Sequence, residues 1–159
     1  MPTINSVNLS PETVSYLTTA LWSSTVMLYE SGEGGFGDYP ENHPLHNALD
    51  GSPLDDHFDI EDLDTASLLK AEQDVNDFFH ALDRHSLLDA AESYADREHI
   101  AHDFWLTRNG HGAGFWDGDY EDYVGEPNSV GDRITDIAKG FGECHIIVCD
   151  NGKLDLCEG

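Results

Sequence analysis

The chain has 159 residues and a formal net charge of −25, from 32 acidic and 7 basic residues. That length suits one domain with a buried core, and 39% hydrophobic residues argue against a disordered chain. The charge argues against direct binding to nucleic acid or anionic membranes, and no apolar run approaches the roughly 20 residues that span a bilayer. The N-terminus lacks the basic and apolar segments of a signal peptide, so we expect one cytoplasmic domain over residues 1–159.

The first predicted helix begins after Ser10, a capping residue that is followed by Pro11 and Glu12, both typical of a first turn. Its apolar face has residues at helical spacing: Val14, Leu17, Leu21, Trp22 and Leu28. The Gly- and Pro-rich stretch SGEGGFGDYPENHP ends this helix, so residues 31–53 are expected to form a loop or insertion.

An acidic stretch precedes the second predicted helix. Residues 50–64 (DGSPLDDHFDIEDLD) hold seven acids, and the first 69 residues contain neither Lys nor Arg. The second helix is expected from about Thr65, with a continuous apolar face: Leu68, Ala71, Val75, Phe78, Phe79 and Leu82. A third, short helix is expected from Ser86, with Asp89 in a capping box and with these residues inward: Leu87, Leu88, Ala91, Tyr94 and Ala95.

Residues 102–119 (HDFWLTRNGHGAGFWDGD) are interpreted as a β-hairpin, because Asn109-Gly110 is a pair that type I′ turns prefer. The cross-strand pairs are then Arg108–His111, Leu106–Ala113 and Phe104–Phe115 on one face, and Trp105–Gly114 and Asp103–Trp116 on the other. We expect Phe104, Leu106 and Phe115 to be core, together with the rings of Trp105 and Trp116. Arg108 and His111 would lie at an exposed tip.

A second hairpin is predicted around Asn151-Gly152 in HIIVCDNGKLDLCE, with Cys149 opposite Leu154 and Ile147 opposite Leu156. Between the hairpins, Ser129 and Asp132 can cap a helix that Gly142 ends, with this apolar face: Val130, Ile134, Ile137, Ala138 and Phe141. Residues 102–159 would therefore run β-β-α-β-β. The predicted fold is α+β, with an antiparallel sheet of about four strands and three to four helices packed on one face.

Metal ligands occur in two clusters, neither of which matches a dedicated site. Cys144, His145, Cys149 and Cys157 are dense, but C-x4-C-x7-C is no common zinc spacing, and in the predicted register Cys149 alone points to the core. The stretch DGDYED (117–122) begins like an EF-hand loop but has Asp122 where Gly is needed and Asn128 where Glu is needed. We expect neither a metal nor another cofactor.

Catalysis is the least supported alternative. His99, His102 and His111 lie near Asp103 and Asp117, so a histidine–carboxylate base is conceivable. The sequence holds no G-x-S-x-G or H-E-x-x-H motif, and GEGGFG lacks the Lys of a phosphate loop. If the chain is an enzyme, the residues that would carry the chemistry are His102, Asp103, Arg108 and His111.

Several motifs resemble one group of proteins: ALWSS, PLDDHFDIEDLD, HDFWLTRNGHGAGFWD, AKGFGE and CDNGKL. Together they are similar to small proteins encoded by tailed bacteriophages and prophages, over most of the chain and in the same order. The chain departs from the group in residues 30–52. The resemblance implies a viral protein in the host cytoplasm, but it supplies no activity and no catalytic residue.

In that context, the acidity favours a nucleic-acid mimic whose carboxylates stand in for phosphates. The partner would be a basic host protein of DNA binding, restriction, CRISPR defence or repair. The candidate contacts are Arg108, His111 and these acids: Asp55, Asp56, Asp59, Glu61, Asp62, Asp64, Glu72, Asp74, Asp77, Asp83, Asp117, Asp119, Glu121 and Asp122. Two alternatives stay open: an accessory protein with a salt-adapted surface, and a small metal-dependent enzyme around His102, Asp103 and His111.

Overall fold

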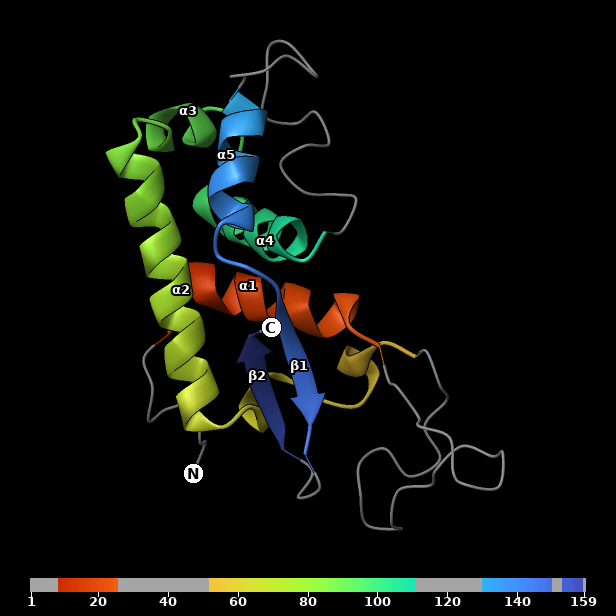
Figure 1. Ribbon diagram of the computed structural model, residues 1–159. Coiled ribbons are helices and arrows are strands. Elements are labelled where there is room, and N and C mark those ends of the chain that lie inside the picture. The colour runs from red at the N-terminus through yellow and green to blue at the C-terminus, as the bar shows by residue number, and fades with distance from the viewer. Residues whose placement is uncertain (1–8, 26–51, 111–129, 150–152, 159) are drawn as a thin grey trace.

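The computed structural model describes residues 9–25, 52–110, 130–149 and 153–158 (Figure 1). In these ranges the elements are α1 (Pro11–Ser23), the 3-10 turns η2 (Leu54–Asp56) and η3 (Ile60–Asp62), α2 (Thr65–Arg84), α3 (Leu88–Glu92), α4 (Arg97–Arg108), α5 (Val130–Lys139), β1 (Cys144–Val148) and β2 (Leu154–Glu158). α2 runs the length of the molecule, α1 and α4 cross it side by side, and α5 and the β1–β2 ribbon complete the fold (Figure 1).

The two longest predicted helices are confirmed. Ser10 caps α1 by accepting a hydrogen bond from the Thr13 amide at 3.2 Å, and Asp64 caps α2 by accepting one from the Ser67 amide at 2.8 Å. All six apolar residues predicted for the face of α2 are buried. On α1 the expected face was only partly right, because Val14 and Trp22 are 38% and 43% exposed. Leu28 and the predicted loop up to residue 51 lie outside the described residues.

α3 begins later than predicted. Ser86 has a φ of 59° and lies in the turn after α2, so it does not cap a helix, and the first helical residue is Leu88. Leu87 and Ala91 are buried as expected, whereas Tyr94 is 38% exposed.

The first predicted hairpin is wrong, because residues 97–108 form helix α4. Asp96 caps this helix by accepting a hydrogen bond from the His99 amide at 2.8 Å. At the other end the side chain of Asn109 donates to the Trp105 carbonyl at 3.0 Å, and Gly110 takes a φ of 75°. The Asn-Gly pair therefore ends a helix, a role in which glycine is as common as in tight turns.

The core positions predicted for three apolar residues of this segment hold, although its secondary structure does not. Phe104, Trp105 and Leu106 are all at most 2% exposed. Phe104 stacks on Phe78 of α2, with ring centroids 4.0 Å apart and planes 1° apart. The other half of the proposed hairpin, including Ala113, Gly114, Phe115 and Trp116, lies outside the described residues.

The C-terminal helix and strands are confirmed, but the strand register is shifted by one residue. α5 buries Ile134 and Ala138, and Gly142 follows it with a φ of 79°. Val148 pairs with Leu154 and Ile146 with Leu156, so the predicted pairings of Cys149 and Ile147 were wrong. Because side chains alternate along a strand, this shift moves Cys144 into the core and leaves Ile147 45% exposed.

The α+β class stands, but the sheet of the described residues has two strands and not four. It is fastened to the start of α2. The Asp64 amide donates to the Leu154 carbonyl at 3.2 Å. The Ser67 hydroxyl donates to Asp155 at 2.8 Å and accepts from the Leu156 amide at 2.9 Å. None of the helices in the described ranges combines the length and the apolarity needed to cross a membrane.

Candidate functional site

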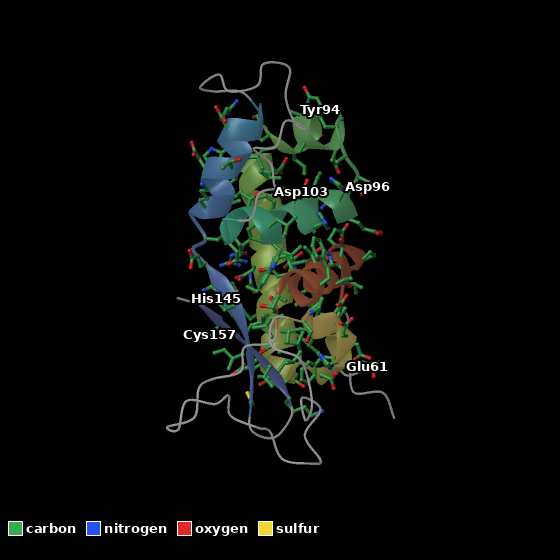
Figure 2. The ribbon with its side chains drawn as sticks, turned by 90° about the vertical axis from the view of Figure 1, so that its right-hand side faces the viewer. Glu61, Tyr94, Asp96, Asp103, His145 and Cys157 are labelled. Carbon is green, nitrogen blue, oxygen red and sulfur yellow. The ribbon has the colours of Figure 1, made fainter. Side chains whose placement is uncertain are left out.

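The most distinctive surface of the described chain is formed by residues 54–64, in which buried and acidic side chains are interleaved. Leu54, Phe58 and Leu63 are at most 5% exposed and anchor the segment in the core. Between them the exposed carboxylates form what we call the acidic ridge: Asp55, Asp56, Asp59, Glu61 and Asp64. Figure 2 shows Glu61 at the outer edge of the molecule, on the side opposite His145 and Cys157. The ridge therefore combines a dense negative charge with a backbone that packing holds in place.

Local hydrogen bonds fix the ridge further. The Asp59 carboxylate accepts from the Glu61 amide at 3.0 Å, and the Asp62 carboxylate accepts from the Asp59 amide at 2.9 Å, which makes η3 a reciprocal capping box. The Leu54 amide donates to the Ser24 carbonyl at 2.9 Å and joins the segment to the end of α1. Half-buried Asp62 thus serves the backbone, while its neighbours on the ridge face solvent.

An open hollow of about 400 Å³ lies beside the ridge. Leu21, Phe58 and Ile60 give it apolar walls, and Asp55, Asp59 and Glu61 supply the charge. An apolar floor under a carboxylate rim suits a Lys or Arg side chain, whose aliphatic stem packs on apolar surface while its charged head stays at the rim. This hollow was not foreseen from the sequence, because part of its wall, Leu21, comes from α1, more than thirty residues away from the ridge.

The acidic face expected on α2 is smaller than predicted. Asp77 and Asp83 are exposed, but Glu72 is half-buried and accepts from the Ser10 amide at 3.1 Å. Asp74 is only 7% exposed and is bonded inside the protein, so it is not available to a partner. The remaining acids of that prediction lie outside the described residues: Asp117, Asp119, Glu121 and Asp122.

Arg108 does not lie at an exposed tip, which corrects the prediction made from the hairpin. It is 3% exposed, and its Nη1 donates to the Tyr16 hydroxyl at 2.9 Å and to the Asp74 carboxylate at 3.0 Å. Its Nε and Nη2 donate to the carbonyls of Gly142 and Phe141 at 2.7 and 3.0 Å. Arg108 thus joins α1, α2 and the turn after α5. Its proposed companion His111 lies outside the described residues.

Burial, together with the neighbouring charges, shifts the pKa of Tyr16 and of Arg108. Burial raises the pKa of the Tyr16 hydroxyl far above its ordinary value, although the positive charge of Arg108 works against that rise. Burial by itself lowers the pKa of the Arg108 guanidinium, but Tyr16, Asp74 and Cys144 outweigh it and leave that pKa raised. Arg108 is therefore a permanent buried cation that holds the structure together, and its placement argues against the catalytic role considered above.

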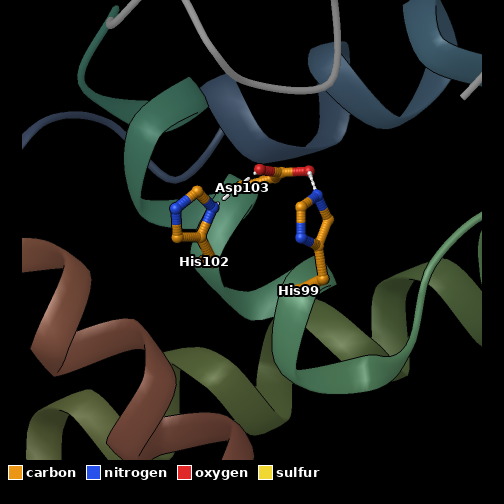
Figure 3. A group of neighbouring side chains, drawn as sticks. All are labelled: His99, His102 and Asp103. Atoms are coloured by element: carbon orange, nitrogen blue, oxygen red, sulfur yellow. Dashed lines mark hydrogen bonds and ion pairs between the residues drawn. The ribbon is translucent and has the colours of Figure 1, made fainter. Parts of the chain in front are cut away.

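A second cluster was only partly foreseen: His99, His102 and Asp103, on one face of α4 (Figure 3). The two imidazoles flank one buried carboxylate. His99 Nε2 lies 3.2 Å from Asp103 Oδ2, and His102 Nδ1 lies 2.9 Å from Asp103 Oδ1. The rings of the two histidines are 5.3 Å apart and nearly parallel, at 20°. The sequence names all three residues, but only their helical spacing of three and four brings them together.

The cysteines are distributed over both faces of the β-ribbon. Cys144 is buried, Cys149 is half-buried and Cys157 is exposed, so the expectation that Cys149 points to the core was wrong. His145 pairs across the ribbon with Cys157 and lies 3.3 Å from the Glu143 carboxylate. The three thiols do not converge, and among the described residues the potential metal-ligand group is the one on α4.

A larger hollow of about 760 Å³ lies at the end of α2. Its walls mix Asp77 and Asp83 with Arg84, so the opposite charges partly cancel. We give it less weight than the smaller hollow, because a recognition site needs a few convergent polar groups rather than size.

Comparison with known proteins finds no match: no protein-family model fits the chain, and no curated protein or solved structure is similar to it. Function must therefore be argued from the acidic ridge and from the cluster on α4.

Proposed function

We propose that this chain acts by binding a basic protein, through the acidic ridge and the hollow beside it. The ridge presents five exposed carboxylates within ten residues, in a part of the sequence without a single Lys or Arg. Such a field accelerates the encounter with a positively charged surface and selects against acidic ones. The observation that carries the proposal is the hollow, because a salt-adapted surface needs charge density alone and has no use for an apolar floor.

The partner we propose is a nucleic-acid-binding protein of a bacterial host, in keeping with the resemblance to bacteriophage proteins. Duplex DNA presents one charge per roughly 1.7 Å of its axis, and proteins that bind it carry Lys and Arg at matching density. A fixed group of carboxylates can occupy such a groove in place of phosphates. The role would then be inhibition of a host DNA-binding or defence protein, such as one of restriction or CRISPR immunity.

The test is capture from host lysate on immobilised protein, at low salt and at about 0.5 M salt, where charges more than a few Å apart are screened. We expect the wild type to retain a nucleic-acid-binding protein at low salt and to release it at high salt. Added duplex DNA should displace the captured protein, because both ligands would occupy the same basic surface. A ridge variant removes four charges: Asp55→Asn, Asp56→Asn, Asp59→Asn and Glu61→Gln.

The matched control removes four exposed charges elsewhere: Asp89→Asn, Glu98→Gln, Asp136→Asn and Glu143→Gln. The ridge variant should lose capture while the control keeps it. Equal loss in both variants would mean that net charge alone acts, as in a salt-adapted accessory protein. The proposal would be contradicted if the wild type captured no protein from the lysate, or if added duplex DNA did not displace the captured protein.

A further inference from the structure

The cluster His99–Asp103–His102 has a composition and a placement that the acidic ridge does not explain. Asp103 has a side chain only 2% exposed, whereas the side chains of His99 and His102 are 47% and 29% exposed. A carboxylate is costly to bury, and such a group is kept where it serves a charge partner or a metal. We propose that His99, His102 and Asp103 form a binding site for a borderline divalent transition metal such as Zn²⁺.

The distances fit that donor set. Zinc binds histidine nitrogen at about 2.0–2.1 Å and carboxylate oxygen at about 2.0–2.2 Å, so neighbouring ligands of a tetrahedral site are about 3.4 Å apart. The two nitrogen–oxygen distances in the cluster are 3.2 Å to Oδ2 of Asp103 and 2.9 Å to its Oδ1, and one ligand atom from each of the three residues lies within 4.8 Å of the other two. A cation would bind one of these oxygens, with the partly exposed imidazoles turned toward it.

Helix α4 accounts for the preorganisation. Residues 99, 102 and 103 lie at positions i, i+3 and i+4, which share one face of a helix. Asp103 is held in the core, and the ring of Trp22 lies 5.8 Å from that of His102. Asp103 and His102 are therefore held by neighbours on their inner side, and His99 is the most exposed of the three ligands, so a cation would enter from its side.

Binding needs no change in net protonation when the imidazoles are neutral. A neutral imidazole with the proton on the facing nitrogen donates to Asp103, whereas metal binding at that nitrogen requires the other neutral tautomer, in which the nitrogen offers its lone pair. The proton moves to the other ring nitrogen, Nδ1 of His99 and Nε2 of His102, by exchange with water. Three protein ligands leave a position for water, which distinguishes an open site from the closed four-ligand sites of structural zinc.

The probes are Zn²⁺ in titration calorimetry and Co²⁺ in visible absorption. The full chain is used without a polyhistidine tag, and Cys149→Ser with Cys157→Ser removes the accessible thiols. Excess Mg²⁺ is present throughout, because it saturates clustered carboxylates but competes poorly for imidazole. We expect one ion to bind per chain. Co²⁺ should quench part of the tryptophan fluorescence, and that quenched part should be missing in Trp22→Phe.

His99→Gln and His102→Gln each remove one ligand from a partly exposed position. Loss of an outer-shell partner alone weakens a metal site about 10–100-fold, so each variant should weaken binding by at least about 100-fold. The matched control is His145→Gln, since His145 also lies beside a carboxylate, Glu143 at 3.3 Å, and is 54% exposed. This control should bind as the parent does.

Three outcomes overturn the site: binding that Mg²⁺ abolishes, equal loss with His145→Gln, or no loss with the variants on α4. Imidazole nitrogen resonances of the parent with Cys149→Ser and Cys157→Ser, in which every histidine is kept, provide a readout that no ligand substitution disturbs. Zn²⁺ should shift those of His99 and His102 and leave His145 unchanged, and the reverse would refute the site. The result does not depend on the acidic ridge, so the two proposals stand or fall separately.

Discussion

Replacement of Arg108 by Met should be among the most damaging single changes in this fold. The side chain of Arg108 makes four hydrogen bonds of 2.7–3.0 Å, to Tyr16, Asp74, Phe141 and Gly142. Met fills a similar volume but donates none of them. The Asp74 carboxylate then keeps Lys70, at 3.2 Å, but loses its buried cation. Breaking a buried ion pair from one side costs about 3–5 kcal/mol, a large share of the roughly 5–15 kcal/mol by which domains are stable.

Urea unfolding followed by circular dichroism gives the free energy of unfolding directly. The control is Arg84→Met, an exposed arginine at the end of α2, which should change that free energy by no more than about 0.5 kcal/mol. The loss in Arg108→Met should be similar at low salt and at about 0.5 M salt, because buried charges are poorly screened. A loss below about 1 kcal/mol would indicate that Arg108 is exposed, as the hairpin predicted, and would refute its buried hydrogen bonds to Tyr16 and Asp74.

Three further predictions concern the core, the net charge and the buried tyrosine. Phe104→Ala should lower the free energy of unfolding by about 3–5 kcal/mol through a cavity against Phe78, and an unchanged thermal midpoint would place that ring outside the core. Raising salt from low ionic strength to about 0.5 M should raise the thermal midpoint, because salt screens the repulsion among the carboxylates of a chain with a net charge of −25. An unchanged midpoint would mean that the carboxylates are too far apart to destabilise the fold by repulsion. The raised pKa of Tyr16 means that the unfolded state loses that proton first, so stability should fall as pH rises above about 10. Tyr16→Phe should make this alkaline decline less steep, and an identical slope in pH-dependent melts would contradict it.

The elements predicted correctly are those whose local sequence pattern and whose packing in the core favour the same structure. The start of α2 at Thr65 and its uninterrupted apolar face were both predicted correctly from the sequence, whereas its cap, Asp64, was not identified. The β-ribbon was also predicted, but not its register. Asn151-Gly152 favours a two-residue turn, whereas the pairing of Val148 with Leu154 leaves a longer connection. The register is set by which side chains of the ribbon are buried in the core. That burial depends on the contacts of β2 with Leu63 and Ser67, which belong to another segment of the chain.

α4 was misread because its strongest local signal has two meanings. Asn109-Gly110 is typical of a hairpin turn and equally of a helix end, and phenylalanine and tryptophan favour strands. The helical signal was present in the acid Asp96 followed by apolar residues four apart, Ile100 and Phe104. This misreading also concealed the metal-ligand cluster, since His99 and Asp103 lie far apart in a strand and meet only on a helix.

The attachment of β2 to the start of α2 has a consequence for the timing of folding during synthesis. The ridge is bounded by Leu63 and Asp64, and these residues are tied to Leu154, which the ribosome adds about ninety residues later. Chains fold as they emerge, at roughly 5–20 residues per second. In a nascent chain the end of the ridge at Leu63 and Asp64 therefore lacks its tie to β2 for seconds, while the capping box of η3 and the bond from Leu54 to Ser24 can already form. That end of the ridge gains its last attachment only when β2 has left the ribosome.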